Sequence, residues 1–569
     1  MFDKVMVANR GEIAVRIFRT LRELGAGSVA VYSEADRGSL HAAYAGEAFL
    51  VEGYLAADAL VETALRAGAQ AVHPGYGFLA ENASFARVVQ DAGLVWIGPP
   101  PEAIELMGEK TRARTAMQAA GVPIIPGTTE PVRSVEELLA LGGSIGYPLL
   151  IKAAAGGGGK GMEVVGGPGD AERAFETARR QGQSYFANPD VYVEKLILDP
   201  RHIEVQVLAD AHGNVVHLGE RDCTIQRRHQ KLVEETPSPA VDDELRARIG
   251  AIGVEAARAA GYVSAGTIEG LLTADGEYFF MEMNTRIQVE HTVTELVTGI
   301  DLVREQVLIA LGEPLSFTQD DVELRGHAIE CRINAEDASK GFLPTPGIVT
   351  SYREPAGPGV RVDSGVDAGR EVVAAYDPMI SKLIVCGVDR EHARRRMLRA
   401  LGEYVIEGPT TLIPFHTALL QHECFIRGET CAGIVESLQV QDGCPPRATG
   451  TLGRTVEDVR TVEVDGRRFQ VRVTEPEAPW LELARRRSER VRAGGHGGTD
   501  VVVSPMQGTV LSVAVADGDE VEAGALICIV EAMKMENEVH AHRAGTVADL
   551  SVAAGQSVAT GQVICVIAD

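Results

Sequence analysis

Residues 282–291 of the 569-residue chain read EMNTRIQVEH, in which polar and apolar side chains alternate. A period of two is typical of a β-strand and would place five polar side chains on one face: Glu282, Asn284, Arg286, Gln288 and Glu290. Two carboxylates, an amide and a guanidinium are costly on a buried face, yet the apolar residues 279–281 just before them argue against a solvent-exposed strand. The stretch therefore predicts a polar functional site built on a sheet.

The same stretch offers oxygen ligands for a hard divalent cation. Glu282 and Asn284 supply two of them, and Glu269 lies in a strand-like segment, residues 267–269, earlier in the chain. Carboxylate and amide oxygens suit Mg²⁺ that bridges nucleotide phosphates. A plain amphipathic strand that faces solvent is the competing interpretation.

A glycine-rich loop precedes this stretch in the sequence. Residues 156–161 read GGGGKG and follow an apolar run, residues 149–151. The loop is not a P-loop, because Lys160 precedes Gly rather than Ser or Thr, and no helical pattern follows it as a dinucleotide-binding motif requires. Glycines let backbone N–H groups approach phosphate oxygens closely. The cationic Lys110, Lys152 and Lys160 favour a nucleotide triphosphate over an ordinary glycine-rich hairpin.

Residues 221–231, RDCTIQRRHQK, concentrate five basic side chains in a chain whose net charge is −26. This run predicts a local anion site, with a solvated basic face as the alternative. The overall acidity excludes nucleic acid as a partner, because a polyanion would be repelled. No apolar run is long enough to span a bilayer, and the apolar stretch at the N-terminus is too short for a secretory signal. The eight cysteines form no CxxC pair, which predicts reduced thiols in a cytoplasmic protein.

The order of predicted elements indicates several domains. Short apolar runs near residues 5–8, 28–32, 71–73 and 94–97 alternate with helical patterns, the first over residues 13–24. Such alternation is typical of parallel βαβ units in a doubly wound sheet. Longer strands with glycine-rich connections are expected from about residue 107 to 315, and a further mixed segment from 325 to 443.

The last part of the chain has a different, all-β pattern. Residues 461–473 alternate around Asp465-Gly466, a strong hairpin signal, and residues 484–498 read as a basic flexible linker. Beyond the linker, Gly508-Thr509-Val510 recurs 37 residues later as Gly545-Thr546-Val547, and four further matches keep that interval. The repeat predicts a small duplicated β-sandwich. Between its two copies, residues 531–537 (EAMKMEN) should form an exposed hairpin tip that carries Lys534.

The sequence Ala532-Met533-Lys534-Met535 in a duplicated β domain resembles biotinyl carrier domains. Exposed methionines are disfavoured unless a partner surface recognises them, so an ordinary turn lysine is a poor explanation. The related lipoyl domain usually flanks its lysine with Asp and Ala. The resemblance implies that a biotin protein ligase attaches biotin to Lys534.

The larger part, residues 1 to about 445, resembles the ATP-grasp biotin carboxylase family. The stretches that carry this resemblance are residues 8–14 (ANRGEIA), 73–79 (HPGYGFL), 226–231, 282–291 and 330–336 (ECRINAE). The implied fold is an α/β (α+β) ATP-grasp carboxylase with an N-terminal doubly wound domain, followed by the all-β carrier. The implied divisions are 1–108 (N-terminal domain), 109–318 (ATP-grasp domain, lid about 130–205), 325–445 (C-terminal domain), 446–499 (linker with hairpin) and 500–569 (carrier).

The resemblance also implies site residues. For ATP they are Lys110, Lys152, Gly158, Gly159, Glu194, Lys195, Leu196, Ile197, His202, Gln226, His229, Glu269 and Glu282. For two Mg²⁺ or Mn²⁺ ions they are Glu269, Glu282 and Asn284. For bicarbonate they are Lys231, Arg286, Gln288, Val289 and Arg332. The implied catalytic residues are Lys231, Arg286, Glu290 as the general base, and Arg332, which would stabilise the biotin enolate.

A carboxylase joined to a carrier lacks a carboxyltransferase, so a separate β subunit is expected as partner. With about 55 residues between Cys444 and Asp500, the chain resembles the short α subunits of bacterial acyl-CoA carboxylases, which act on acetyl-CoA, propionyl-CoA or related substrates in pathways such as fatty acid biosynthesis. Carboxylase-domain homodimers are also implied. Two alternatives remain: the α chain of a pyruvate or other keto-acid carboxylase, and a non-catalytic carrier. The hairpin at 461–473 is a hypothetical docking element for the β subunit.

Overall fold

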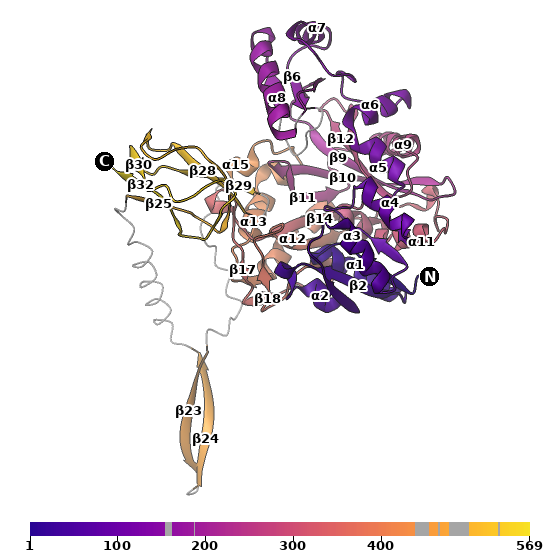
Figure 1. Ribbon diagram of the computed structural model, residues 1–569. Helices are drawn as coiled ribbons and strands as arrows, with labels where there is room; N and C mark the ends of the chain where they lie inside the picture. Colours follow the sequence, from indigo (N-terminus) through magenta and orange to yellow (C-terminus); the bar gives the residue numbers. More distant parts are fainter. Residues whose placement is uncertain are drawn as a thin grey trace. The chain divides into compact units, whose positions relative to one another are not determined.

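The computed structural model describes residues 1–153, 162–186, 188–438, 455–464, 467–476, 500–532 and 535–568. The chain folds as two compact units, one within residues 1–441 and the other mostly within residues 442–569. Among the described residues, no helix is both long and apolar enough to cross a membrane. Figure 1 shows the elements of both units, which are described separately below.

The N-terminal layer is a five-stranded parallel sheet with strand order β3-β2-β1-β4-β5. The strands are β1 (Lys4–Val7), β2 (Gly27–Tyr32), β3 (Glu47–Leu50), β4 (Ala71–His73) and β5 (Val95–Trp96). The helices are α1 (Gly11–Glu23), α2 (Leu40–Tyr44), α3 (Ala57–Arg66), α4 (Ala83–Asp91) and α5 (Pro101–Gly108). Helix α1 buries Ile13, Ile17 and Leu21, which lie one turn apart on one face. The predicted doubly wound layer is confirmed, and β3 is a strand that the sequence pattern missed.

A small lid-like subdomain follows. Helix α6 (Lys110–Ala119) precedes it and packs with α9 in the core of the central sheet; the subdomain itself comprises α7 (Val135–Ile145), β6 (Leu149–Ala153), β7 (Met162–Val165), α8 (Ala171–Phe186) and β8 (Val191–Lys195). Its three strands form an antiparallel sheet in the order β7-β6-β8. Leu149, Ile151 and Val193 pack with Phe175 of α8 in a separate apolar core. The residues between β6 and β7 include Gly158 and Gly159, which lie outside the described residues.

The centre of the first unit is an eight-stranded sheet in the order β13-β12-β9-β10-β11-β14-β21-β19. Its strands are β9 (Arg201–Ala209), β10 (Val215–Arg227), β11 (Gln230–Thr236), β12 (Ser264–Leu272), β13 (Tyr278–Asn284), β14 (His327–Asn334), β19 (Val360–Ser364) and β21 (Met379–Gly387). All neighbouring pairs are antiparallel. One sheet thus joins strands from either side of residues 318–325, where the sequence predicted a domain division. That division stays a prediction.

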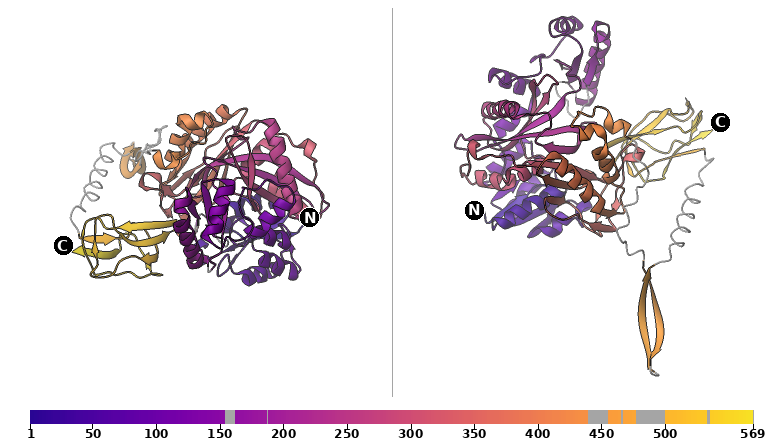
Figure 2. Two further views of the ribbon diagram at one scale, coloured as in Figure 1. Left: turned by 90° about the horizontal axis from the view of Figure 1, so that it is seen from above. Right: turned by 180° about the vertical axis from the view of Figure 1, so that it is seen from behind.

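Helices cover this sheet on both faces. They are α9 (Asp243–Ala259), α10 (His291–Thr298), α11 (Leu302–Ala310), α12 (Arg390–Glu403), α13 (Ile413–Gln421), α14 (Glu423–Ile426) and α15 (Ile434–Ser437). Apolar residues of β9 and β12 pack against α9, for example Val205 and Ile268 against Ala256. The N-terminal layer (indigo) packs beside the sheet in both views of Figure 2, and Phe18 and Leu208 belong to one shared core.

Six short strands complete the C-terminal part of the first unit. They pair as β15 (Glu336–Asp337) with β16 (Leu343–Pro344), β17 (Gly347–Ile348) with β20 (Glu371–Val372), and β18 (Ser351–Arg353) with β22 (Val405–Glu407).

One prediction about the cysteines is wrong: Cys424 and Cys431 form a disulfide, although reduced thiols were expected. The seven-residue spacing is not a recognised motif, but the turn after α14 brings the two Cα atoms within 5.6 Å. Cys223, Cys331, Cys386, Cys528 and Cys565 are free.

The second unit contains the predicted hairpin and the duplicated domain. Strands β23 (Thr455–Val464) and β24 (Arg467–Pro476) pair antiparallel with Val464 opposite Arg467, which confirms the hairpin and extends it. The linker residues 484–498 lie outside the described residues.

The duplicated domain has two four-stranded sheets, ordered β25-β32-β30-β27 and β29-β28-β26-β31. Its strands are β25 (Val501–Val503), β26 (Gly508–Val513), β27 (Glu520–Val521), β28 (Leu526–Ala532), β29 (Met535–His540), β30 (Gly545–Ala548), β31 (Ser557–Val558) and β32 (Val563–Ala568). Replacing each strand by its repeat converts one sheet order into the other, so the predicted duplication is confirmed. Lys534, between β28 and β29, lies outside the described residues.

Candidate active site

Lys231 on β11 lies among three buried carboxylates. Its Nζ is 2.8 Å from Glu269 Oε1 and 2.7 Å from Glu290 Oε1, and it also contacts Glu204. Burial alone would lower the pKa of Lys231, but the three carboxylates raise it well above its ordinary value. The site therefore holds a permanent cation at its centre.

Glu290 connects this cation to a second one on the neighbouring strand. Arg332 of β14 donates from Nη2 to Glu290 Oε2 over 2.9 Å and from Nε to Glu234 Oε1 over 2.6 Å. Burial would raise the pKa of Glu290, but Lys231 and Arg332 hold it well below the usual range. Burial raises the pKa of Glu234 to about 7, although Arg332 acts in the other direction. Glu290 is therefore ionised between two fixed cations.

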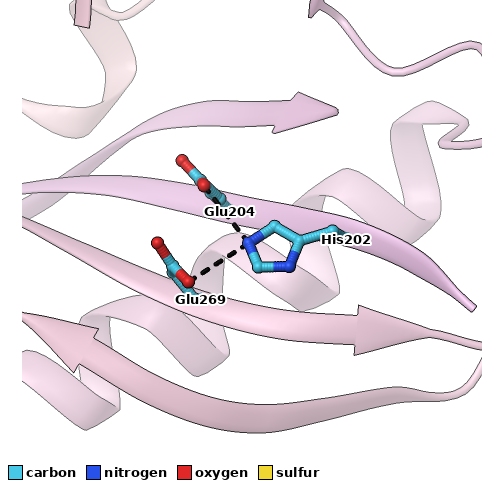
Figure 3. Close-up of side chains that lie close together, drawn as sticks. All are labelled: His202, Glu204 and Glu269. Carbon is cyan, nitrogen blue, oxygen red and sulfur yellow. Dashed lines mark ion pairs between the residues drawn. The ribbon is translucent and has the colours of Figure 1, made fainter. Parts of the chain in front are cut away.

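His202 on β9 faces two of the same carboxylates (Figure 3). Its Nε2 is 3.3 Å from Glu204 Oε1 and 3.2 Å from Glu269 Oε2. Burial would lower the pKa of His202, but Glu269 and Glu204 raise it to about 9. The imidazole is thus a third positive group in the cluster, on the side away from Arg332's strand.

The predicted metal ligands lie together on β12 and β13. Glu269 and Glu282 are direct cross-strand partners, as are Thr267 and Asn284, and Asn284 Nδ2 donates to Glu269 Oε1 over 2.7 Å. Burial and the charge of Glu269 raise the pKa of Glu282. Like charges directly opposite each other destabilise a sheet, and a divalent cation with oxygen ligands relieves that repulsion. The donor set therefore fits Mg²⁺.

The strand predicted over residues 282–290 is partly wrong, because β13 ends at Asn284. Pairing with β12 stops at Thr267 opposite Asn284, and the next residues turn into a loop that leads to α10. Glu81 holds this loop: it accepts from the Thr285 N–H over 3.1 Å and from Arg286 Nε over 2.9 Å. The bonds to residues outside the sheet replace the missing strand pairing.

The loop still turns its polar side chains toward the cluster. Gln288 Nε2 donates to Glu269 Oε1 over 2.6 Å, and Arg286 Nη2 donates to Asn284 Oδ1 over 2.9 Å. The Val289 carbonyl accepts from the fully buried Lys382 over 2.8 Å, which fixes the backbone next to Glu290. Residues expected on one strand face are thus brought together by a loop.

The predicted ATP residues of the lid form a separate group. Glu194 on β8 lies 2.6 Å from Arg114 Nη1 and 2.5 Å from Lys152 Nζ, and Lys195 Nζ donates to the Tyr147 carbonyl over 2.7 Å. The Leu196 N–H donates to the Pro148 carbonyl, Ile197 follows it, and Lys110 begins α6. The contacts named here join the lid to itself and to α6 and do not include the Lys231 cluster.

Gln226, the cross-strand partner of Lys231, lies near the C-terminal end of β10 and lines a cavity of about 220 Å³. The opposite wall is formed by residues 430–436, which include Cys431 of the disulfide. Gln226 Nε2 donates to the Cys223 carbonyl over 2.8 Å. His229 lies in the turn between β10 and β11 with φ of 65°, a left-handed conformation.

Four residues of these clusters were missed by sequence reasoning: Glu204, Glu234, Glu81 and Arg114. For Glu204 a signal existed, since His202, Glu204 and Gln206 alternate with Ile203, Val205 and Val207 along residues 202–207. For the others, the sequence offers no pattern that separates them from ordinary charged residues.

Family models and known proteins match most of the chain. Family models match residues 1–104 (biotin carboxylase, N-terminal domain), 109–318 (carbamoyl-phosphate synthase L chain, ATP binding domain), 330–437 (biotin carboxylase C-terminal domain) and 500–567 (biotin-requiring enzyme). Biotin carboxylase 1 of Bacillus subtilis is 51% identical over 447 residues, which cover 77% of this chain and 99% of that protein. The chain belongs to the biotin carboxylase family. It is an ATP-grasp ligase of this family joined to a biotin carrier domain.

Two further relatives belong to carboxylases that are named for different acceptors. The biotin-dependent acyl-coenzyme A carboxylase alpha3 subunit of Mycobacterium leprae is 44% identical over 569 residues, covering 95% of this chain and 94% of that one. The biotin carboxylase domain of Hydrogenobacter thermophilus 2-oxoglutarate carboxylase, a dimer solved with MgADP, ADP and bicarbonate, is 45% identical. Its TM-score is 0.74, and the match covers 78% of this chain and 99% of that one. These two relatives do not fix the acceptor of this biotin carboxylase.

Proposed function

We propose that this biotin carboxylase uses ATP and bicarbonate to carboxylate biotin carried on its own Lys534. The carboxyl group is then transferred by a separate carboxyltransferase β subunit to acetyl-CoA, propionyl-CoA or a related acyl-CoA. The observation that carries the proposal is the chain of contacts from Lys231 through Glu290 to Arg332, which alternates cation, carboxylate and cation. An anionic substrate and a base meet there.

Bicarbonate is the substrate that this arrangement suits. Lys231 and Arg286 supply positive charge for the anion, and Gln288 with the backbone of Val289 supplies polar contacts beside them. Glu290 is ionised and can take the bicarbonate proton, which makes the remaining oxygen a better nucleophile toward the γ-phosphate of ATP. The products of that attack are carboxyphosphate and ADP.

Carboxyphosphate then gives CO₂ and phosphate inside a site from which water is excluded. The phosphate removes the ureido N–H proton of biotin, and negative charge develops on the ureido oxygen. Arg332 can offset that charge, because its guanidinium is fixed by Glu234 and Glu290. The biotin nitrogen then attacks CO₂ to give carboxybiotin.

ATP would be held by residues of the lid and the central sheet. The proposed set comprises Lys110, Lys152, Gly158, Gly159, Glu194, Lys195, Leu196, Ile197, His202, Gln226, His229, Glu269 and Glu282. Glu269, Glu282 and Asn284 would hold Mg²⁺, which neutralises phosphate charge when bound. The dimer solved with MgADP and bicarbonate supports these ligands for a relative of known structure.

The share of this chain that each relative matches favours an acyl-CoA acceptor. The Mycobacterium leprae alpha3 subunit matches 95% of this chain, whereas a pyruvate carboxylase subunit of Methanothermobacter thermautotrophicus, 53% identical, matches 75% of it. A match over 95% of the chain must include part of the carrier domain, residues 500–569, whereas a match over 75% need not. A keto-acid carboxylase remains the second candidate, and the 2-oxoglutarate carboxylase likeness supports it.

Capture of the native chain on monomeric avidin, with mass identification of the co-eluting proteins, tests both the biotin on Lys534 and the class of the carboxyltransferase partner. Capture requires biotin on Lys534, so a chain that never binds would remove the carrier proposal, and Lys534→Arg is the matched control. A crotonase-like partner would support acyl-CoA carboxylation. A TIM-barrel partner would contradict it and favour a keto acid.

The hairpin β23–β24 is the proposed docking element for that β subunit. An isolated two-stranded hairpin is marginally stable, so a partner surface would stabilise it. Deleting residues 461–473 should leave ATP cleavage unchanged but abolish co-purification of the β subunit. Unchanged binding would reject the proposal. Biotin protein ligase and a second carboxylase copy are the other expected partners.

A further inference from the structure

Arg221 on β10 is an arginine with no exposed side-chain surface. It binds buried side chains of β9, β12 and α10 and of the loop before α10. Nη1 donates to Gln206 Oε1 on β9 over 2.7 Å and to Thr294 Oγ1 on α10 over 3.1 Å. Nη2 donates to Thr267 Oγ1 on β12 over 3.1 Å. These neutral partners fix the plane of the guanidinium, since each takes a different N–H direction.

Two further partners of Arg221 are Gln288, a proposed bicarbonate residue, and Glu204, which pairs with the proposed bicarbonate residue Lys231. Its Nη2 donates to Gln288 Oε1 over 2.6 Å, and its Nε and Nη2 donate to Glu204 Oε2 over 3.3 and 3.1 Å. Glu204 Oε1 is thereby left for Lys231 and His202. Arg221 thus reaches the cluster without touching Glu290 or Arg332 by a hydrogen bond.

The bond to Gln288 decides which way the amide of that side chain points. Because Oε1 accepts from Arg221, Nε2 faces Glu269 and donates to it over 2.6 Å. A flipped amide would place N–H against the guanidinium and oxygen against the carboxylate, so both contacts would become repulsive. Arg221 and Glu269 together permit a single orientation.

We propose that Arg221 is a positioning residue for bicarbonate, holding the Gln288 amide and the Glu204 carboxylate in the orientation that the anion requires. This inference rests on the proposed function. No ligand contact is assigned to Arg221 itself, since its N–H groups are directed to the five side chains named above. Arg221 orients the Gln288 amide before the substrate binds, so the amide loses no orientational freedom when bicarbonate binds.

The test compares Arg221→Lys and Arg221→Met in the full biotinylated chain. Lysine keeps the buried positive charge beside Glu204 but cannot form the set of hydrogen bonds that the planar guanidinium donates. We therefore expect Arg221→Lys to recover most of the melting temperature that Arg221→Met loses. We also expect Arg221→Lys to raise the KM for bicarbonate roughly tenfold in bicarbonate-dependent ATP cleavage, with the KM for MgATP changed less than about twofold.

The matched control is Arg246→Lys. Arg246 pairs with Glu220, the residue next to Arg221 on β10, and contacts Asp243 of α9 on the other face of the strand. It should leave both KM values unchanged. Equal losses for ATP and bicarbonate in Arg221→Lys, or full recovery of the bicarbonate KM together with stability, would overturn the inference and leave Arg221 a structural residue.

Two less disruptive variants test the same inference if the proteins with a substituted Arg221 do not fold. Thr267→Val and Thr294→Val each remove one acceptor of the guanidinium and keep side-chain shape. Each should raise the bicarbonate KM about twofold to threefold, in the same direction as Arg221→Lys. Values equal to wild type in both would contradict the inference. Absence of bicarbonate-dependent ATP cleavage in the wild-type chain would instead reject the proposed function.

Discussion

Arg332 Nη2 donates to Glu290 Oε2 over 2.9 Å, although 42 residues separate the two along the chain. The contact exists because α10, which begins directly after Glu290, packs on β14, where Val293 and Val297 share an apolar cluster with Ala328. It joins the loop that carries Glu290 to a strand from the C-terminal part of the first unit. The proposed base and the proposed enolate-stabilising cation therefore share one hydrogen bond before any substrate binds.

Replacing Glu290 by glutamine tests the base directly. Glu290→Gln keeps the shape of the side chain but cannot accept the bicarbonate proton. We expect bicarbonate-dependent ATP cleavage to fall about 100-fold or more. The measurement is phosphate release with and without bicarbonate. Glu244→Gln, an exposed carboxylate in the first turn of α9, is the matched control and should retain full activity.

Glu282 is expected to set the metal requirement. Glu282→Gln removes one charged oxygen ligand and also relieves repulsion with Glu269. The Mg²⁺ concentration for half-maximal ATP cleavage should rise roughly 10-fold to 100-fold, while folding stability stays the same or increases. Glu277→Gln lies on the exposed turn before β13 and serves as control. An unchanged Mg²⁺ dependence would remove Glu282 from the proposed ligand set.

His73 should make the N-terminal layer sensitive to acid. The Gly75 N–H donates to its Nδ1, so its Nε2 carries the proton that is donated to Gln306, and burial lowers the pKa of His73 to about 4. Its ordinary pKa is 6.5, so the unfolded chain binds a proton in this window and the folded one does not. The stabilisation is present above pH 6.5 and is lost as the pH falls toward 4.

Urea unfolding of the wild type and of His73→Gln across this pH range measures that contribution. The wild-type free energy of unfolding should fall more steeply than that of the variant, by about 1.4 kcal/mol per pH unit below 6.5. His41 and His416, whose pKa values burial also lowers to about 4, add the same kind of dependence to both proteins. Equal slopes for the two proteins would contradict the assignment to His73.

The disulfide between Cys424 and Cys431 should contribute to the stability of the C-terminal part. It closes a seven-residue spacing, and loop-closure entropy alone corresponds to about 2 kcal/mol for a loop of this length. A reductant should lower the free energy of unfolding of the wild type by that amount. The double variant Cys424→Ser/Cys431→Ser should not respond to it. A wild type that is insensitive to reductant would show that the bond is not formed in solution.

Local patterns were enough to predict much of the fold. The βαβ alternation predicted the parallel N-terminal layer, and the 37-residue interval between Gly508 and Gly545 predicted the two matching sheets. Strand β3 was missed because EAFL is too short and too exposed to show a clear apolar period. The strand at 282–290 was over-extended because its period of two continues past Asn284, where pairing with β12 stops.

The disulfide could not have been predicted from spacing. Eight cysteines allow many pairings, and the proximity of Cys424 and Cys431 depends on the turn that follows α14. The partners Glu204 and Glu234 were missed for a related reason. A charged residue in a strand reveals neither which face it occupies nor which charge lies opposite until the strands are aligned.

The sequence by itself determined the family of this biotin carboxylase, its order of domains and the residue types its chemistry needs, because motifs and periodicity are properties of neighbouring residues. Only the tertiary structure decided that Lys231 lies among Glu204, Glu269 and Glu290, and that Arg332 reaches Glu290 from another strand. It also decided which of these groups are charged. The physical reason is that burial and long-range charge contacts set the protonation of each group, and both arise when distant strands pair in one sheet.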